Sequence, residues 1–265
     1  MRRPDGVRAR RADRALKPRA AVSLARALSK FGVCSRREAE RFIEAGRVAV
    51  DGKPERSPRR FIDPARDKVT VDGRRVSDAT PRVVIALHKP RGLVTTRVDP
   101  GGRPTVYDAL GTLPRWVFPV GRLDRDSSGL LILTNDHRLG ERLTSPDAHV
   151  PKTYHARVCG VPDAEALRAL REGLELEDGS LTREAKVKVI GAARGTDAAS
   201  TWLELVLTEG KNRQVRRMGS AVGHEVLELV RVKIGRLGLG ELAPGEWREL
   251  EPREIALLAG RAARD

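Results

Sequence analysis

The chain has 265 residues, of which 51 are Lys or Arg and 36 are Asp or Glu, so its formal net charge is +15. This length fits one large domain, or a small domain followed by a larger one. No apolar run reaches the ~18 residues of a membrane span, and the arginine-rich start lacks the apolar core of a secretory signal. Two distant cysteines, Cys34 and Cys159, argue against a disulfide framework or a zinc site and favour a cytoplasmic location.

The positive charge is concentrated at the front of the chain. Residues 1–80 hold 22 basic and 11 acidic residues, whereas the remaining 185 hold 29 and 25. This excess favours a polyanionic partner, and a nucleic acid would be bound mainly through its phosphates. A general preference for arginine over lysine would explain the type of cation but not the asymmetry. Residues 1–21 are rich in arginine and lack a periodic apolar face, which predicts a disordered basic arm.

Two short helices are predicted after this arm. Leu24, Leu28 and Phe31 recur at helical spacing before Gly32 ends the first helix. Ser35 begins the second helix, because a glutamate three residues later completes a capping box. On this second helix the apolar residues share one side. The basic residues on the opposite arc are Arg36, Arg37, Arg41 and Arg47.

Short strands with Asp-Gly turns at residues 51–52 and 72–73 follow, in "RVAVDGKPE" and "KVTVDGRRV". The whole stretch, with "FGVCSRREAERFIEAGRVAVDGK" at its centre, resembles the S-four-type RNA-binding domain over residues 22–77. That resemblance implies that the four arginines meet structured RNA. Without it, a solvated helix face would be the simpler interpretation of these side chains.

Residues 78–82 are polar and contain a proline, which predicts a linker, and a larger domain follows at 83–250. Its expected strands are "VVIALHKP", "GLLILTN", "KTYHARVCG", "WLELVLTEG" and "HEVLELVRVKIG". Helices are expected in 163–174 and in 212–223. The C-terminal segment 251–265 is predicted to be a helix or a tail. Strands with few interleaved helices favour an α+β fold with a mixed, mainly antiparallel sheet.

Several chemistries find no matching motif. The segment "GRLGLG" lacks dinucleotide-binding spacing, and "EGKN" lacks the remaining residues of a phosphate-binding P-loop. The five histidines do not fall in zinc-ligand patterns, and there is no GxSxG nucleophile elbow. We therefore expect neither a metal nor an organic cofactor.

One stretch concentrates charge at the start of an apolar strand: "PVGRLDRDSSGLLILTND", residues 119–136. It resembles the signature of the RsuA/RluB-type ribosomal RNA pseudouridine synthases. The blocks "PKTYHARVCG" at 151–160 and a long one at 207–250, which begins "LTEGKNRQVRRM", follow in the order that this family has. The resemblance implies a uridine isomerase that needs no group donor, acts on ribosomal RNA or a pre-ribosomal particle, and works as a monomer away from membranes.

The resemblance also implies roles for individual residues. Asp124 is the reacting carboxylate, which either adds covalently or abstracts a proton, and Lys211 is its ion-pair partner, because a neighbouring cation favours the ionised form. Tyr154 stacks on the flipped base, although a strand tyrosine alone would more often be packing. Arg122 either holds the turn or fills the gap that the extruded nucleotide leaves, and its alternative is a salt bridge that only orders the loop.

Other charged residues of these blocks have binding or structural interpretations. Lys152 either contacts a backbone phosphate or ends a strand in solvent. Arg213, Arg216 and Arg217 are spaced to form one helix face, which predicts a phosphate-binding ridge beside the site. Asp126 is expected to fix the turn through local hydrogen bonds.

Two functions of different class remain open at this point. The first is a ribosomal RNA pseudouridine synthase, with a tendency of the 209–218 block toward the large-subunit branch. The second is an RNA-binding or ribosome-assembly factor on the same fold, with secondary or lost catalysis. The presence of Asp124, Tyr154 and Lys211 favours the enzyme.

Overall fold

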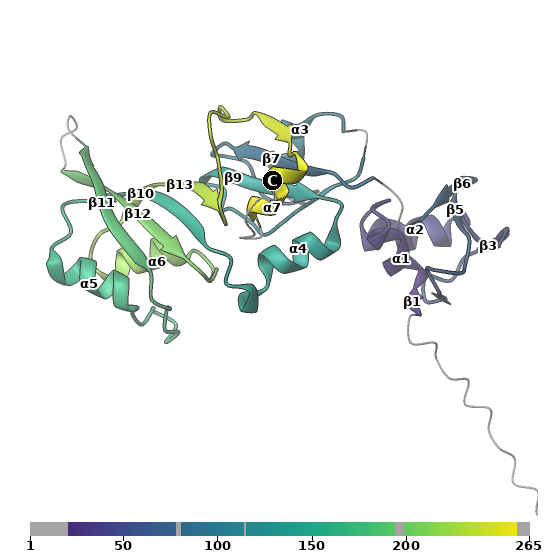
Figure 1. Ribbon diagram of the computed structural model, residues 1–265, viewed down its shortest axis with the longest axis horizontal. Helices are drawn as coiled ribbons and strands as arrows, with labels where there is room; N and C mark the ends of the chain where they lie inside the picture. Colours follow the sequence, from purple (N-terminus) through teal and green to yellow (C-terminus); the bar gives the residue numbers. More distant parts are fainter. Residues whose placement is uncertain (1–20, 78–80, 114, 194–198, 259–265) are drawn as a thin grey trace, which may run out of the picture. The chain divides into compact units, whose positions relative to one another are not determined.

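A computed structural model describes residues 21–77, 81–113, 115–193 and 199–258 of the chain (Figure 1). The predicted arm at 1–20, the start of the linker at 78–80 and the last residues from 259 lie outside this range. The chain divides into two compact units, Met1–Phe31 with Ser35–Ala79, and Gly32–Cys34 with Thr80–Asp265. The division falls inside the predicted linker.

The first unit contains the two expected helices and two small sheets. The helices are α1 (Leu24–Lys30) and α2 (Arg36–Glu44). The Ser35 side chain accepts a hydrogen bond from the Glu38 backbone and the Glu38 side chain accepts one from the Ser35 backbone, which confirms the capping box. The sheets are β1 (Val22–Ser23) with β4 (Phe61–Ile62), and four strands in the order β3 (Lys53–Glu55), β2 (Val48–Val50), β5 (Val69–Val71) and β6 (Arg74–Val76).

The two Asp-Gly turns of this unit are confirmed. Asp51 and Gly52 have φ values of 51° and 79°, and Asp72 and Gly73 have 48° and 76°. Two successive positive φ angles are the geometry of a hairpin turn that matches the twist of its strands. The first turn sets the register in which Val48 pairs with Glu55, and the second sets the one in which Val71 pairs with Arg74. On the paired central strands, Val48 and Val71 are buried.

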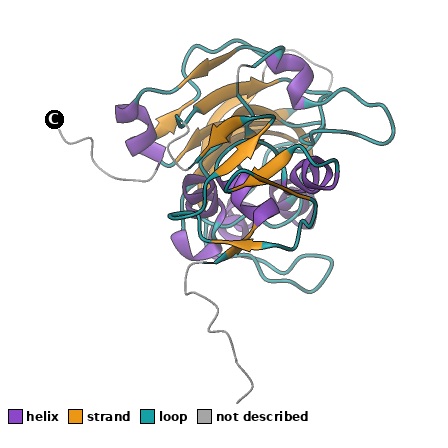
Figure 2. Ribbon diagram, turned by 90° about the vertical axis from the view of Figure 1, so that its right-hand side faces the viewer, coloured by secondary structure: helices purple, strands orange, loops and turns teal. Residues whose placement is uncertain are grey.

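The second unit is built on one sheet of nine strands, which confirms the predicted mixed, mainly antiparallel sheet. Figure 2 shows the strands in orange and the helices in purple. Seven strands form the main path in the order β11 (Lys186–Ala193), β12 (Ser200–Leu207), β10 (Lys152–Cys159), β13 (Val226–Ile234), β9 (Ser128–Thr134), β7 (Val84–Lys89) and β15 (Trp247–Glu249). The short strands β8 (Phe118–Pro119) and β14 (Leu237–Gly238) pair with β9 and β13.

The centre of this sheet joins segments that are distant in sequence. Strand β13 lies between β9 and β10, and it pairs with β9 in parallel through Val230↔Ser128 and Arg231↔Gly129. Gly129 has a φ of +107°, and a Cβ atom there would lie 2.3 Å from the Arg231 carbonyl oxygen. Glycine is therefore required at this position for the two strands to approach each other.

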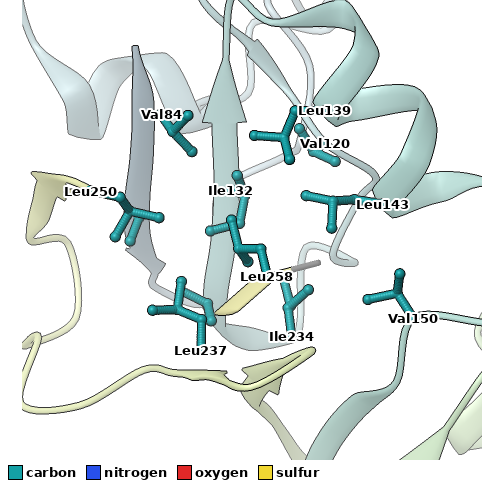
Figure 3. Close-up of a cluster of buried hydrophobic side chains, with 12 residues drawn as sticks. Val84, Val120, Ile132, Leu139, Leu143, Val150, Ile234, Leu237, Leu250 and Leu258 are labelled. Carbon is teal, nitrogen blue, oxygen red and sulfur yellow. The ribbon is translucent and has the colours of Figure 1, made fainter. Parts of the chain in front are cut away.

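The helices of the second unit pack on both faces of the sheet. Leu170 of α5 (Ala164–Glu172) and Met218 of α6 (Gln214–Ala221) are buried in one cluster with residues of strands β10, β12 and β13. Near β7 and β9, α4 (His137–Thr144) and α7 (Pro252–Leu258) cover one face, and Figure 3 shows Leu139 and Leu143 gathered around Ile132. On the opposite face, α3 (Val106–Leu110) buries Leu110 with Leu131.

Some of these elements were not expected from the sequence. Helices α3 and α4 are short, and α4 contains Gly140, at which a Cβ atom would lie 2.9 Å from the Phe118 ring. A glycine within eight residues weakens the helical pattern, and tertiary packing decides the outcome. The C-terminal segment is also more than a tail, because Leu258 of α7 is fully buried in the core of the second unit.

Candidate active site

A cavity of about 370 Å³ opens in the second unit where the three sequence blocks meet. Asp124 and Arg122 reach it from the loop before β9, and Tyr154 and Lys152 from β10. The loop between β12 and α6 brings Lys211 and Arg213. All four predicted catalytic residues therefore line one cavity.

A buried lysine that was not predicted from the sequence holds the loop that carries Asp124. Lys89, at the end of β7, has a relative exposure of 0%. Its ammonium donates hydrogen bonds to the carbonyl oxygens of Ser127 at 2.8 Å and Pro90 at 3.0 Å. Burial lowers the pKa of Lys89 to about 8, although the nearby Asp126 and Asp124 partly oppose this shift. The available signal in the sequence was a lysine at the end of the predicted apolar strand "VVIALHKP".

The cation that pairs with Asp124 is not the predicted one. Nη1 of Arg213 lies 3.6 Å from Oδ2 of Asp124, whereas no salt bridge joins Lys211 to Asp124 in the described part of the chain. The cause is local: Arg213 adopts a left-handed φ of 47° as the residue before α6, and the Lys211 backbone donates to the Gln214 side chain. Lys211 lines the cavity without the expected ion pair.

Asp126 fixes the loop, but through long-range ion pairs rather than the expected local hydrogen bonds. Its carboxylate lies 3.1 Å from Nη2 of Arg216 and 3.4 Å from Nη1 of Arg213. Burial raises the pKa of Asp126, but the charges of Arg216 and Arg213 outweigh this effect and lower it overall. Arg216 also donates to the carbonyl oxygens of Asp126 and Val226.

The predicted ridge of three free arginines is therefore not what the structure has. The Arg216 side chain is 13% exposed and serves the Asp126 loop. That of Arg217 is 15% exposed and pairs at 2.7 Å with both Glu177 and Asp178. These acidic partners lie about forty residues upstream, so that helix spacing alone could not reveal them. Arg213 alone of the three reaches the cavity.

The remaining predicted residues divide according to their contacts. Arg122 is exposed and makes no hydrogen bond or ion pair with the residues described, so that the loop-ordering salt bridge is not present. Lys152 is half-buried, and burial together with the charge of Arg231 lowers its pKa. Tyr154 is half-buried and packs against apolar residues of two core clusters.

On α2 of the first unit, Arg37 and Arg41 are exposed on the side opposite the buried Ala39 and Ile43, and Arg36 is exposed at the first position of the helix. Arg47 differs, because it pairs with Asp72 at 2.6 Å and lies over the Phe42 ring at 4.1 Å. Three arginines of the helix are thus exposed, with Arg47 tied to the sheet.

Neither a metal cluster nor a membrane helix is found in the described ranges. No group of three or more His, Cys, Asp or Glu side chains there is arranged to hold a metal ion. In the same residues, no helix has the length and apolarity needed to cross a bilayer.

Comparison with known proteins assigns a family model to each of two parts of the chain. The family model described as RNA pseudouridylate synthase matches residues 83–221, and the S4 domain model matches residues 23–66. The chain is 39% identical over 239 residues to ribosomal large subunit pseudouridine synthase B of Bacillus subtilis (strain 168), covering 90% of this chain and 96% of the relative. The protein of the same name from Salmonella typhimurium is 41% identical over 244 residues, covering 89% and 82%.

A solved structure, described as the crystal structure of pseudouridylate synthase, is similar over 89% of this chain and 99% of its own, with a TM-score of 0.64 and 28% identity. Family model, relatives and fold thus agree with one another. The chain belongs to the RNA pseudouridylate synthases, enzymes that isomerise uridine to pseudouridine, and carries an RNA-binding S4 domain in front of its catalytic unit.

Proposed function

We propose that this enzyme modifies a uridine of large-subunit ribosomal RNA, with Asp124 as the reacting carboxylate. One observation carries the site assignment: Asp124, Tyr154 and Lys211 come from three separate sequence blocks and line one cavity. The substrate class is inferred from the relatives named ribosomal large subunit pseudouridine synthase B. Their coverage of about nine-tenths of this chain includes both units.

The reaction rearranges one nucleotide. The bond from the ribose C1′ to the uracil N1 breaks, the base turns, and C1′ bonds to C5; C5 loses a proton and N1 gains one. Such a sequence needs a group that adds to the substrate or removes a proton, and an ionised carboxylate can do either. Nη1 of Arg213 lies 3.6 Å from Oδ2 of Asp124 and pairs with this carboxylate at the cavity.

The other residues receive roles from their positions. A cavity of about 370 Å³ falls within the usual range of small-ligand sites, which accords with a base flipped out of an RNA. Tyr154 offers an aromatic face to that base. Arg122, exposed and without a partner in the residues described, is available to the space that the flipped nucleotide leaves or to a phosphate.

RNA delivery is assigned to cations at two places. Arg36, Arg37 and Arg41 of α2 are exposed for contact with phosphates, in agreement with the S4 domain match. Lys152, Lys211 and Arg213 line the cavity. We infer that ribosomal RNA or a pre-ribosomal particle is the partner, and that the enzyme acts as a monomer in the cytoplasm.

Mapping pseudouridines in ribosomal RNA from cells with and without this gene tests the proposed substrate. A large-subunit site should lose its modification in the deletion and regain it with the wild-type gene. Release of tritium from C5 of uracil-labelled RNA then measures the rate. Unchanged pseudouridine maps, or a change confined to another RNA class, would contradict the substrate assignment.

Two aspartates form a matched pair for testing the reacting group. Asp124→Asn should leave folding intact and lower the rate by at least about a thousandfold, because the group that performs the chemistry is lost. Asp126→Asn should lower thermal stability and reduce the rate less, because Asp126 orders the loop through Arg216. Equal rates for wild type and Asp124→Asn would refute the catalytic assignment.

A further inference from the structure

Two buried polar groups that line the cavity lack a partner among the described residues. Arg231 on β13 is 5% exposed, and its Nε donates to the Leu130 carbonyl oxygen at 2.8 Å, but its Nη2 has no hydrogen-bond partner. Ser127 is 1% exposed, and its Oγ likewise has none. Both residues line the same cavity as Asp124. Since buried polar groups are rarely left unpaired, this pair requires an explanation.

The sheet places Arg231 beside the residue proposed to stack on the base. Arg231 and Tyr154 are direct partners on the antiparallel strands β13 and β10, so that their side chains project from the same face. On the other side Arg231 is paired with Gly129, which contributes no side chain. The guanidinium therefore belongs to the part of the cavity that Tyr154 also lines.

The charges around Arg231 favour an electron-rich ligand. No carboxylate forms a salt bridge with it in the described part of the chain, in contrast to Arg213, Arg216 and Arg217. Its charge also acts on the half-buried Lys152, whose pKa burial and Arg231 lower. A cation that burial removes from water, and that no carboxylate neutralises, gains most from an oxygen acceptor supplied by a ligand.

The base of the substrate fits this acceptor better than a phosphate does. Phosphates of an RNA remain on its backbone, whereas the flipped base is the part that enters a protein pocket. The exposed Arg122 and Arg213 at the same cavity are accessible to phosphates. Arg231 is 5% exposed and lines the cavity, so a group that enters the cavity can approach it more closely than a phosphate that stays on the RNA backbone.

We propose that Arg231, through Nη2 and assisted by the Ser127 hydroxyl, hydrogen-bonds a carbonyl oxygen of the flipped uracil. This assignment rests on the proposed function. When the C1′–N1 bond breaks, its electron pair stays on the uracil and spreads onto O2 and O4. A fixed cation at one of these oxygens stabilises the charge as it develops. At O4 it would also reject cytosine, which presents an amino donor there.

The first test replaces Arg231 by methionine, which keeps an unbranched side chain and removes the donors and the charge. On an RNA that carries the mapped uridine, the single-turnover rate of Arg231→Met should fall about ten- to a hundredfold, as expected for a lost hydrogen bond to a charged donor. Arg157→Met is the matched control, because Arg157 pairs with Glu228 on the same two strands and does not line the cavity. Its rate should equal that of wild type.

The second test alters the substrate atom and does not depend on the folding of a variant. RNAs with 2-thiouridine or 4-thiouridine at the target replace one carbonyl oxygen at a time by sulfur, a weaker acceptor. Wild type should respond more strongly to the thio-substitution at the contacted oxygen than Arg231→Met does, and the other substitution should affect both enzymes alike. If Arg231→Met does not fold, a wild-type rate equal for uridine and both thio-uridines overturns the proposal.

The possible outcomes separate the two levels of inference. An inactive wild-type enzyme on the ribosomal RNA would refute the proposed function and this assignment with it. An active wild type, together with an equally active Arg231→Met or with thio effects that are the same in both enzymes, would refute the role of Arg231 alone. A lower rate that couples to one carbonyl oxygen supports it.

Discussion

Two arginine-rich helices, one in each unit, use the same type of residue in opposite ways. On α2, the basic side chains Arg36, Arg37 and Arg41 are exposed. On α6, Arg216 and Arg217 are mostly covered and are paired with carboxylates of the Asp126 loop and of residues 177–178. In sequence, both helices show arginines at helical spacing beside an apolar face.

The difference lies in the acidic residues of distant segments. Spacing on a helix predicts which arginines share a face, but the partner of that face is set by the tertiary fold. On α6 the partners are 40 and 90 residues away in the chain. Arginine can therefore serve RNA binding in one unit and hold a catalytic loop in the other. Four variants test this division, in order of decreasing effect.

Lys89 is fully buried, and its replacement should have the largest effect on the unfolding free energy and its dependence on pH. Burial lowers its pKa from 10.5 to about 8. Between these values the unfolded chain binds the extra proton, so that the unfolding free energy of wild type should rise with pH through this window, by about 3 kcal/mol in total. Below pH 8 this cost of burial is fully present. Urea unfolding from pH 7 to 10.5 should show the rise in wild type and its absence in Lys89→Met; parallel pH curves would contradict it.

Arg216→Met should destabilise the second unit by about 2 kcal/mol, less than the loss of a fully buried pair because Asp126 is partly exposed. The cause is that the Asp126 carboxylate loses one of its two arginine partners, and the carbonyl oxygens of Asp126 and Val226 lose a donor. Chemical denaturation measures the stability, and tritium release should show a lower rate. A stable variant with weakened RNA binding would restore the phosphate-binding interpretation of α6.

The triple substitution Arg36→Ala, Arg37→Ala and Arg41→Ala should weaken RNA binding about tenfold and make its dependence on salt shallower, by two to three in the logarithmic slope. These side chains are exposed, so thermal stability should stay within experimental error of wild type. Filter binding at several salt concentrations provides the slope. A loss of stability without a change in slope would place these arginines in a structural role.

Arg217→Met should have the smallest effect, because the carboxylates of Glu177 and Asp178 are themselves exposed. A slightly lower melting temperature is expected at low salt, and the difference from wild type should vanish near ~1 M salt, where surface charges are screened. RNA affinity should not change. A salt-dependent loss of RNA affinity would instead show that Arg217 is available to phosphates.

The sequence predicted the structural features that lie within single motifs. The capping box at Ser35, the two Asp-Gly turns and the strand after Gly129 follow from local spacing, and the structure has all of them. The Arg213 pairing of Asp124 was not predictable, because it depends on a left-handed residue before α6. The burial of Lys89 and Arg231 was not predictable for a related reason. Whether a charged residue in a strand is buried depends on the strands and loops that pack around it.

Strand β13 comes late in the chain, followed in this sheet by the short strands β14 and β15, and its position has a consequence for biosynthesis. It occupies the centre, between β9 and β10, yet it follows β9 by about a hundred residues in the chain. A nascent chain can display Asp124 and Tyr154 long before residues 226–234 leave the ribosome, but without them the cavity lacks the wall that Leu229, Arg231 and Ile234 provide. We therefore expect the cavity to be complete only after residues 226–234 have joined the sheet.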